Sequence, residues 1–235
     1  MKIELYLIRH GKTRSNEEKR YVGRATDIGL NESGKAEIRE KAAAGCYPKE
    51  PRFVFSSPMK RALETAQIIY PEKEKIIIDD LTEIEFGIFE GKNYTELNGT
   101  PEFQSWIDSG GKMQIPGGES LEDFCLRVKR GLEKLKSIVL EKMDGAGRDT
   151  TETGKTDAVG GTVVAGGAVV AGGTIVTGGA DAGEAVVEEE ETGENCVQVA
   201  LICHGGTIMA ARRVLEGKEY FDSIPDNGES CLVEL

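Results

Sequence analysis

Two strand-like segments that each end in a histidine constrain this chain more than any other feature. The first is an apolar, alternating run over residues 3–8, and it leads through an arginine to His10. The second covers residues 197–203 and leads to His204, and a glycine follows each histidine. Alternation and branched side chains are typical of strands. Because the chain has only two histidines, we expect both at the carboxyl edge of one sheet, where open α/β folds bind ligands.

Strand and helix patterns alternate through the rest of the chain. The predicted elements are strands over 3–8, 53–57, 75–79 and 197–203, an edge strand over 230–235, helices over 31–44, 58–69, 121–139 and 207–215, and short helices over 94–97 and 102–107. Pro58 suits the first position of its helix, and the 121–139 helix has one apolar stripe that predicts burial. The alternation predicts an α/β fold, a three-layer sandwich whose mostly parallel central sheet has helices on both faces.

Residues 144–195 differ from the rest of the chain in composition. They contain 13 glycines, 11 acidic and two basic residues, and no aromatic residue. A six-residue repeat starts at Gly160, Gly166 and Gly172. Its Gly-Gly pairs suit hairpin turns, but such a segment buries too little apolar surface to order by itself, so we favour a flexible loop. The sequence therefore predicts one domain over 1–235, interrupted by a glycine-rich acidic insert at about 144–195.

Charge and cysteine usage narrow the expected partners and compartment. The insert holds most of the net charge of −12, and the remainder has no strongly basic face, so we expect no nucleic-acid partner. No signal-like leader precedes the first strand, and no apolar run approaches membrane-spanning length. The five cysteines lack the spacing of a metal site or a disulfide framework. We expect a cytoplasmic protein without a membrane partner, and its oligomeric state stays open.

Three further polar residues are predicted at the same sheet edge. Arg9 precedes His10, Arg61 falls in the first turn of the helix after the second strand, and Glu83 follows the third strand. Arginine forks match phosphate oxygens, and a histidine with a nearby carboxylic acid can serve phosphoryl transfer. The sequence contains no P-loop and no cluster with metal-ligand spacing. We therefore expect covalent catalysis by histidine, with no metal and no cofactor.

Five segments resemble signatures of the histidine phosphatase superfamily, which has the phosphoglycerate mutase-like fold. They lie at 9–13 with Asn16, at 56–66, at 81–91, at 116–121 and at 204–206. The first is similar to the RHGxTxxN signature, and all five follow the order of the family. The resemblance covers the chain except for the insert. The segments over 81–91 and 116–120 resemble most the branch that contains α-ribazole phosphatases of the cobalamin pathway and broad-specificity phosphatases.

This resemblance implies a two-step reaction. His10 would attack phosphorus and become a phosphohistidine, while Glu83 would protonate the leaving alkoxide and then deprotonate the attacking water. The residues implied to hold the phosphoryl group are Arg9, Arg61 and His204, with Asn16 and the Gly205 N–H as further donors. Glu85 lies two residues after Glu83 and stays open as the acid, although the family spacing favours Glu83.

The expected activity is that of a metal-independent phosphomonoesterase acting on a small phosphorylated metabolite, with α-ribazole phosphate as one candidate. One alternative is a phosphoglycerate mutase, which needs further basic residues to hold a second charged group. Residues 94–111 contain no arginine or lysine, which favours hydrolysis. The other alternative is a non-catalytic module that binds phosphorylated ligands or proteins, with the insert as an interaction arm. All five catalytic candidates are present, which argues against that alternative.

Deletion of residues 145–194 is expected to leave phosphatase activity largely intact. The segment joins a helix pattern to a strand pattern, so we expect it to decorate the domain without entering its core. Turnover of a phosphomonoester by the shortened and the full-length chain, measured side by side, checks this expectation. Failure of the shortened chain to fold in soluble form would contradict it.

Overall fold

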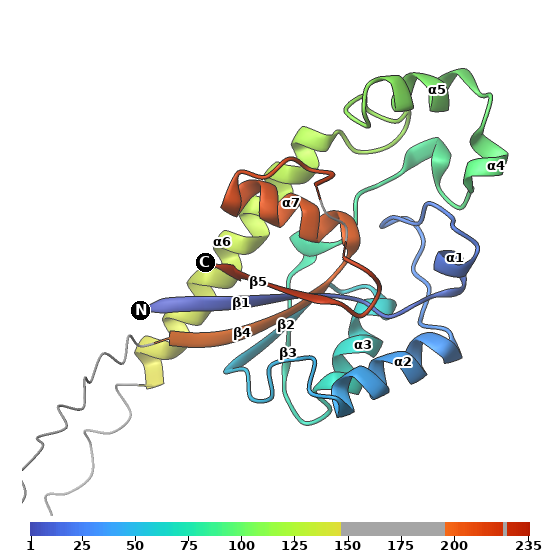
Figure 1. Ribbon diagram of the computed structural model, residues 1–235. Coiled ribbons are helices and arrows are strands. Elements are labelled where there is room, and N and C mark those ends of the chain that lie inside the picture. The colour runs from blue at the N-terminus through green and yellow to red at the C-terminus, as the bar shows by residue number, and fades with distance from the viewer. Residues whose placement is uncertain (147–195, 223–224) are drawn as a thin grey trace, which may run out of the picture.

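A computed structural model describes residues 1–146, 196–222 and 225–235 of the protein (Figure 1). Within these residues, five strands form one sheet in the order β3-β2-β4-β1-β5. The strands are β1 (Lys2–Arg9), β2 (Phe53–Ser56), β3 (Lys75–Ile77), β4 (Cys196–Cys203) and β5 (Ser230–Glu234). Four of them run parallel, and β5 lies antiparallel to β1 at the edge. The mostly parallel sheet that the sequence predicts is confirmed.

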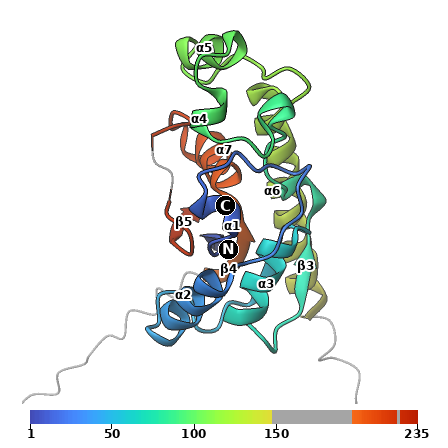
Figure 2. The ribbon, with the colours of Figure 1, turned by 90° about the vertical axis from the view of Figure 1, so that its right-hand side faces the viewer.

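Helices cover both faces of this sheet (Figures 1 and 2). The helices of the two layers are α2 (Glu32–Ala43) with α3 (Lys60–Ile69), and α6 (Leu121–Ala146) with α7 (Gly205–Glu216). Side chains of β4 alternate between the layers, since Leu201 packs in the core beside α6 and α7 whereas Ile202 packs in the core beside α3. Two apolar cores therefore enclose the sheet, as expected for parallel strands that are buried on both faces.

The long helix α6 carries the buried stripe that its sequence predicts. Phe124, Val128, Leu132, Leu135 and Val139 are at most 2% exposed, and they recur at intervals of three and four residues. These side chains share one apolar cluster with side chains of β1 and β4. Burial of this stripe fixes α6 against the sheet, because removing apolar surface from water is the main favourable term in folding.

Residues 82–120, between the 3₁₀ turn η1 (Asp79–Leu81) and α6, project beyond the carboxyl edge of the sheet as a cap (green in Figure 1). The cap contains the 3₁₀ turn η2 (Gly87–Phe89) and the helices α4 (Tyr94–Leu97) and α5 (Pro101–Asp108). Its buried apolar side chains form a small cluster separate from the two sheet cores. The chain that follows α1 (Arg14–Glu17) joins the cap through a β-bridge between Arg20 and Asn93.

The start of α3, the end of α6 and the start of α7 differ from the prediction. Pro58 lies before α3 and not at its first position, because Met59 is extended and precedes the helix. α6 continues to Ala146, so the helix reaches into the segment assigned to the insert. α7 begins at Gly205, directly after His204 and two residues earlier than expected. The rest of the insert, including its six-residue repeat, lies outside the described residues.

The insert joins the domain far from the cap. Met143 near the end of α6 and Cys196 at the start of β4 line one surface hollow. The start of β4 and the end of α6 lie at the amino edge of the sheet, whereas the cap lies beyond the carboxyl edge (Figure 1). No helix among the described residues is long and apolar enough to cross a membrane.

Truncation of the α6 stripe is expected to destabilise the fold. Leu135→Ala removes a side chain that is 0% exposed, and a change of this kind lowers the free energy of unfolding by about 2–5 kcal/mol. The matched control Lys136→Ala changes an exposed neighbour on the same helix, and its effect should stay below about 0.5 kcal/mol. Denaturant unfolding of both variants measures the difference. Equal effects would show that the stripe is not core.

Candidate active site

His10 stands at the carboxyl end of β1, directly opposite His204 on the neighbouring strand. The register pairs Arg9 with Cys203, and the two histidine rings lie 5.2 Å apart between centroids. The Nδ1 atom of His10 is 2.7 Å from the carbonyl oxygen of Gly11. A carbonyl can only accept, so Nδ1 carries the proton and Nε2 keeps its lone pair.

The charge state of His10 follows from its surroundings. Its side chain is buried, and this burial, followed by the positive charge of Arg61, lowers the pKa of His10 to about 3. The imidazole is therefore neutral at pH 7. A neutral ring with a free Nε2 is the form of histidine that can act as a nucleophile.

Two arginines line the cavity next to His10, and neither has a carboxylate within ion-pair distance among the described residues. Arg61 is 2% exposed, and its terminal nitrogens donate to the carbonyls of Gly23 and Thr26, each at 3.1 Å. Arg9 donates to the carbonyl of Pro225 at 2.7 Å. Burial lowers the pKa of both guanidinium groups, yet arginine keeps its charge in proteins.

One buried side-chain nitrogen of these two arginines lacks a hydrogen-bond partner among the described residues. The Nε atom of Arg9 is buried and has no hydrogen bond to any described residue. Unpaired buried donors are rare and destabilising, so an anion bound between the two arginines would stabilise the site by accepting a hydrogen bond from this nitrogen. The arrangement favours a phosphate-sized anion beside His10.

His204 lies beside His10 at the predicted edge of the sheet, and its two ring nitrogens contact other side chains. Its Nδ1 accepts a hydrogen bond from Nε of Arg61 at 3.2 Å, and its Nε2 lies 2.8 Å from the hydroxyl of Ser57. The ring is fully buried, which lowers its pKa well below the usual value, and it is not among the residues that line the cavity. In this geometry His204 orients the guanidinium of Arg61, and direct contact with a phosphoryl oxygen stays a prediction.

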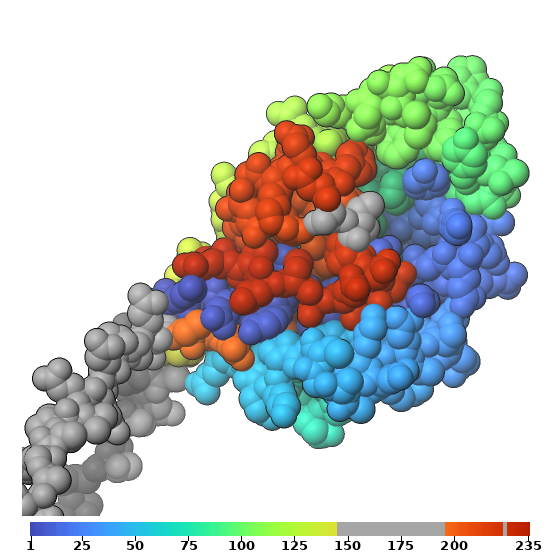
Figure 3. Space-filling view, in the orientation of Figure 1, coloured from blue at the N-terminus to red at the C-terminus, as the bar shows by residue number. Residues whose placement is uncertain are grey.

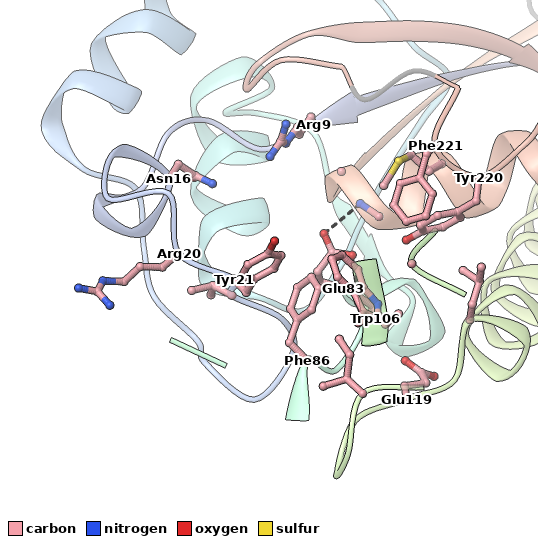
Figure 4. Close-up of a pocket in the computed structure, with 18 of the residues that line it drawn as sticks. Arg9, Asn16, Arg20, Tyr21, Glu83, Phe86, Trp106, Glu119, Tyr220 and Phe221 are labelled. Carbon is pink, nitrogen blue, oxygen red and sulfur yellow. Dashed lines mark hydrogen bonds between the residues drawn. The ribbon is translucent and has the colours of Figure 1, made fainter. Parts of the chain in front are cut away.

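Glu83 lies in the loop after η1 and lines the same cavity as His10. Its two carboxyl oxygens accept hydrogen bonds from the backbone N–H groups of Ile84 and Gly206, both at 3.0 Å, and Figure 4 shows the second of these. Burial raises the pKa of Glu83 despite these bonds, so the carboxyl is disposed to hold a proton. A Cβ atom on Gly206 would collide with Glu83 Oε1, and only glycine at that position allows this approach.

The two candidate acids differ clearly in position. Glu83 is 8% exposed and lines the cavity. The Glu85 side chain is 32% exposed, forms an ion pair with Arg24 at 2.8 Å, and is not a lining residue. The geometry therefore favours Glu83 over Glu85 as the group that can reach a bound ester.

Asn16 and Gly205 line the same cavity as the arginines. The Asn16 side-chain oxygen accepts from both the backbone N–H and the hydroxyl of Thr13, at 3.0 and 2.9 Å. This capping box at the start of α1 leaves the Asn16 amide nitrogen to donate to a ligand. Gly205 begins α7, and an added Cβ there would lie only 3.2 Å from the guanidinium carbon of Arg9.

Arg127 on α6 is a residue that sequence reasoning missed. Its guanidinium donates to the carbonyls of Asp80, Thr82 and Glu83 at 2.8 to 3.2 Å, and forms a two-pronged ion pair with Glu119 at 2.7 and 2.8 Å. Arg127 thus anchors the loop that presents Glu83. The sequence feature that could have indicated this role is an arginine at a position where the pattern of α6 predicts burial.

The organic part of a ligand would face a wall that the sequence left undetermined. The cavity has a volume of about 360 Å³ and opens between the cap, the α1 segment and the segment that directly follows α7 (Figure 3). Its aromatic lining consists of Tyr21, Phe86, Trp106, Tyr220 and Phe221 (Figure 4). Among the described residues, no group of three or more His, Cys, Asp or Glu side chains could hold a metal ion.

Two arginines with little or no exposure to solvent, a neutral histidine and a carboxylic acid at the carboxyl edge of an α/β sheet are typical of sites of the phosphatase and mutase class. A family model of the histidine phosphatase superfamily (branch 1) matches residues 5–141, and the chain belongs to this superfamily.

Individual relatives agree with this assignment. A bifunctional protein of Mycobacterium tuberculosis is 36% identical over 137 residues, which cover 56% of this chain and 36% of that protein. The chain thus spans about a third of that relative's length. Fructose-2,6-bisphosphatase TIGAR B of Danio rerio is 34% identical over 152 residues, covering 60% of this chain and 56% of the relative.

A solved structure extends the likeness over nearly the whole chain. The crystal structure of phosphoglycerate mutase from Thermus thermophilus superposes with a TM-score of 0.58 at 26% identity. The match covers 98% of this chain and 92% of that chain. The phosphoglycerate mutase-like fold predicted from the sequence is therefore confirmed.

The buried neutral state of His10 is expected to make the fold sensitive to acid. An unfolded histidine takes up a proton as the pH falls through about 6.5, whereas His10 stays neutral down to about 3. Acid therefore favours the unfolded chain, and His10 accounts for a loss of about 2 kcal/mol between pH 7 and pH 5. Urea unfolding at both pH values should show this extra loss in the wild type relative to His10→Gln. Equal losses would mean that His10 is not held neutral.

Proposed function

We propose that the protein is a metal-independent phosphomonoesterase that hydrolyses a small phosphorylated metabolite through a phosphohistidine intermediate. The observation that carries the proposal is the arginine pair beside the free Nε2 of neutral His10, with Arg61 buried, Arg9 partly buried, and no carboxylate partner for either among the described residues. A phosphoryl group supplies the negative charge that this pair lacks. Independence from metal and a cytoplasmic location stay predictions of the sequence.

In the first step, His10 Nε2 attacks phosphorus and the bond between phosphorus and the ester oxygen breaks. Glu83 gives its proton to the departing oxygen, which leaves as an alcohol. Arg9 and Arg61 hold the nonbridging oxygens on which charge accumulates. The raised pKa of Glu83 supports this role, because the acid must enter the step protonated.

In the second step, Glu83 is a carboxylate and accepts a proton from water as the water oxygen attacks phosphorus. The bond between phosphorus and His10 breaks, its electron pair returns to Nε2, and inorganic phosphate forms. Glu83 is protonated again and the cycle closes. Backbone hydrogen bonds from Ile84 and Gly206 stabilise the carboxylate that exists between the two steps.

The walls of the cavity favour hydrolysis of a phosphomonoester whose organic part is uncharged over mutase chemistry. Besides Arg9 and Arg61, the lining contains one further cation, Arg20, and its guanidinium is tied to Glu18 and Glu96 at 2.6 and 2.8 Å. A second anionic group of the substrate would therefore find no free cation among the lining residues. The aromatic wall suits an apolar organic group, and α-ribazole phosphate, which carries an aromatic base, is a candidate of this kind.

Turnover of p-nitrophenyl phosphate with and without a chelator tests the proposed function. We expect equal rates in both conditions and no measurable turnover by His10→Ala, which lacks the nucleophile. With benzyl phosphate, whose leaving group needs a proton, Glu83→Gln should lower kcat/KM by about 10²–10⁴-fold. The matched control Glu85→Gln should stay within about twofold, because Glu85 is outside the cavity.

Each other outcome contradicts a defined part of the proposal. Turnover that requires added metal refutes the histidine mechanism. Absence of turnover by the wild type on phosphomonoesters, including α-ribazole phosphate and 3-phosphoglycerate, indicates a binding module. Transfer of the phosphoryl group between positions of phosphoglycerate would identify a mutase.

A further inference from the structure

Tyr220, in the segment after α7, presents its hydroxyl to the catalytic cavity. Its side chain is 6% exposed and lines that cavity. The rings of Phe221 and Phe124 contact it edge to face, with centroids 4.8 and 6.4 Å away. These contacts hold the phenol ring in one orientation.

The Tyr220 hydroxyl differs from those of other buried tyrosines. Tyr47 and Tyr70 are buried to the same degree, and their hydroxyls donate to the carbonyls of Gly228 and Pro48 at 2.8 and 3.0 Å. Within the described part of the chain, no hydrogen bond involves the Tyr220 hydroxyl, and Tyr220 lines the cavity. Tyrosine hydroxyls in protein interiors usually bond to something, so this hydroxyl is available to a bound molecule.

The Tyr220 hydroxyl lies near the carboxyl group of Glu83. Both Glu83 Oε1 and the Tyr220 oxygen lie within 2.9 Å of the point where a Gly206 Cβ would stand. In Figure 4 the hydroxyl of Tyr220 points toward the Glu83 carboxyl. The two groups do not bond to each other, but they are close enough for one oxygen atom to contact both.

We propose that the Tyr220 hydroxyl is a catalytic group that donates a hydrogen bond to the oxygen on which Glu83 acts. This proposal rests on the proposed phosphatase function. In the first step that oxygen is the leaving-group oxygen, which gains negative charge as its bond to phosphorus breaks and takes its proton from Glu83. In the second step it is the water oxygen, which attacks phosphorus while its proton passes to Glu83.

Tyr220 itself neither gains nor loses a proton in either step. Burial, followed by the nearby charge of Glu83, raises the pKa of the phenol well above its usual value, so the group stays a donor across the working range. Its contribution is greatest when the leaving oxygen becomes most negative, because hydrogen bonds to charged oxygens are the stronger ones. Esters of alkyl alcohols should therefore depend on Tyr220 more than esters of acidic phenols.

Tyr220→Phe, which removes only the hydroxyl, tests the proposal. The measurement is kcat/KM for benzyl phosphate and for p-nitrophenyl phosphate, which are similar in size but differ in the need for a proton on the leaving oxygen. We expect a loss of about tenfold for benzyl phosphate, which is the effect of one hydrogen bond to a charged group. The loss for p-nitrophenyl phosphate should stay within about twofold, and the Tm should not fall, because the hydroxyl has no partner among the described residues.

Tyr70→Phe is the matched control, since its hydroxyl does have a backbone partner and is not a lining residue. We expect a lower Tm and unchanged kcat/KM for both esters. Loss of the same size on both esters in Tyr220→Phe, or no loss on either, overturns the catalytic role of Tyr220 while leaving the proposed function in place. If the wild type turns over neither ester, the proposed function and the role of Tyr220 fail together.

Discussion

The rest of this site depends on two arginines, Arg61 buried and Arg9 partly buried, that have no carboxylate partner within the described part of the chain. Removing a cation from water is expensive unless polar groups replace its hydration. Here the replacement comes from backbone carbonyls around Arg61 and Arg9 and from the ring of His204. These hydrogen bonds fix the loops that supply the carbonyls. The positive charge of the two arginines has no negative partner among the described residues, and a phosphoryl group would supply one.

The same burial shifts the pKa values of His10 and Glu83 in opposite directions. It lowers the pKa of His10 and raises the pKa of Glu83, because low polarity disfavours whichever form carries the charge. One environment therefore favours the neutral form of both His10 and Glu83. The nearby arginines reinforce the neutral state of His10, and for Glu83 they moderate the effect of burial.

Much of this arrangement follows from local sequence patterns. Strand ends were predictable from periodicity, and a parallel sheet brings such ends to one edge, so His10, Arg61 and Glu83 could be expected to meet. Other features could not be predicted, because each depends on the packing of segments far apart in the chain. They are the hydrogen bond from Arg61 to His204, the anchoring of the Glu83 loop by Arg127, and the Tyr220 hydroxyl without a partner among the described residues. The predicted start of α3 at Pro58 was two residues too early, because Met59 is extended and the helix begins at Lys60. The glycine-rich insert lies outside the described residues.

The cap has an apolar cluster of its own, separate from the cores that support the sheet. Its aromatic side chains Phe86 and Trp106 line the cavity, and so does Glu83 from the start of the same segment. His10, in contrast, follows a strand of the central sheet. In the proposed reaction, substitutions at Phe86 or Trp106 can therefore change which ester fits while the sheet keeps His10 in place.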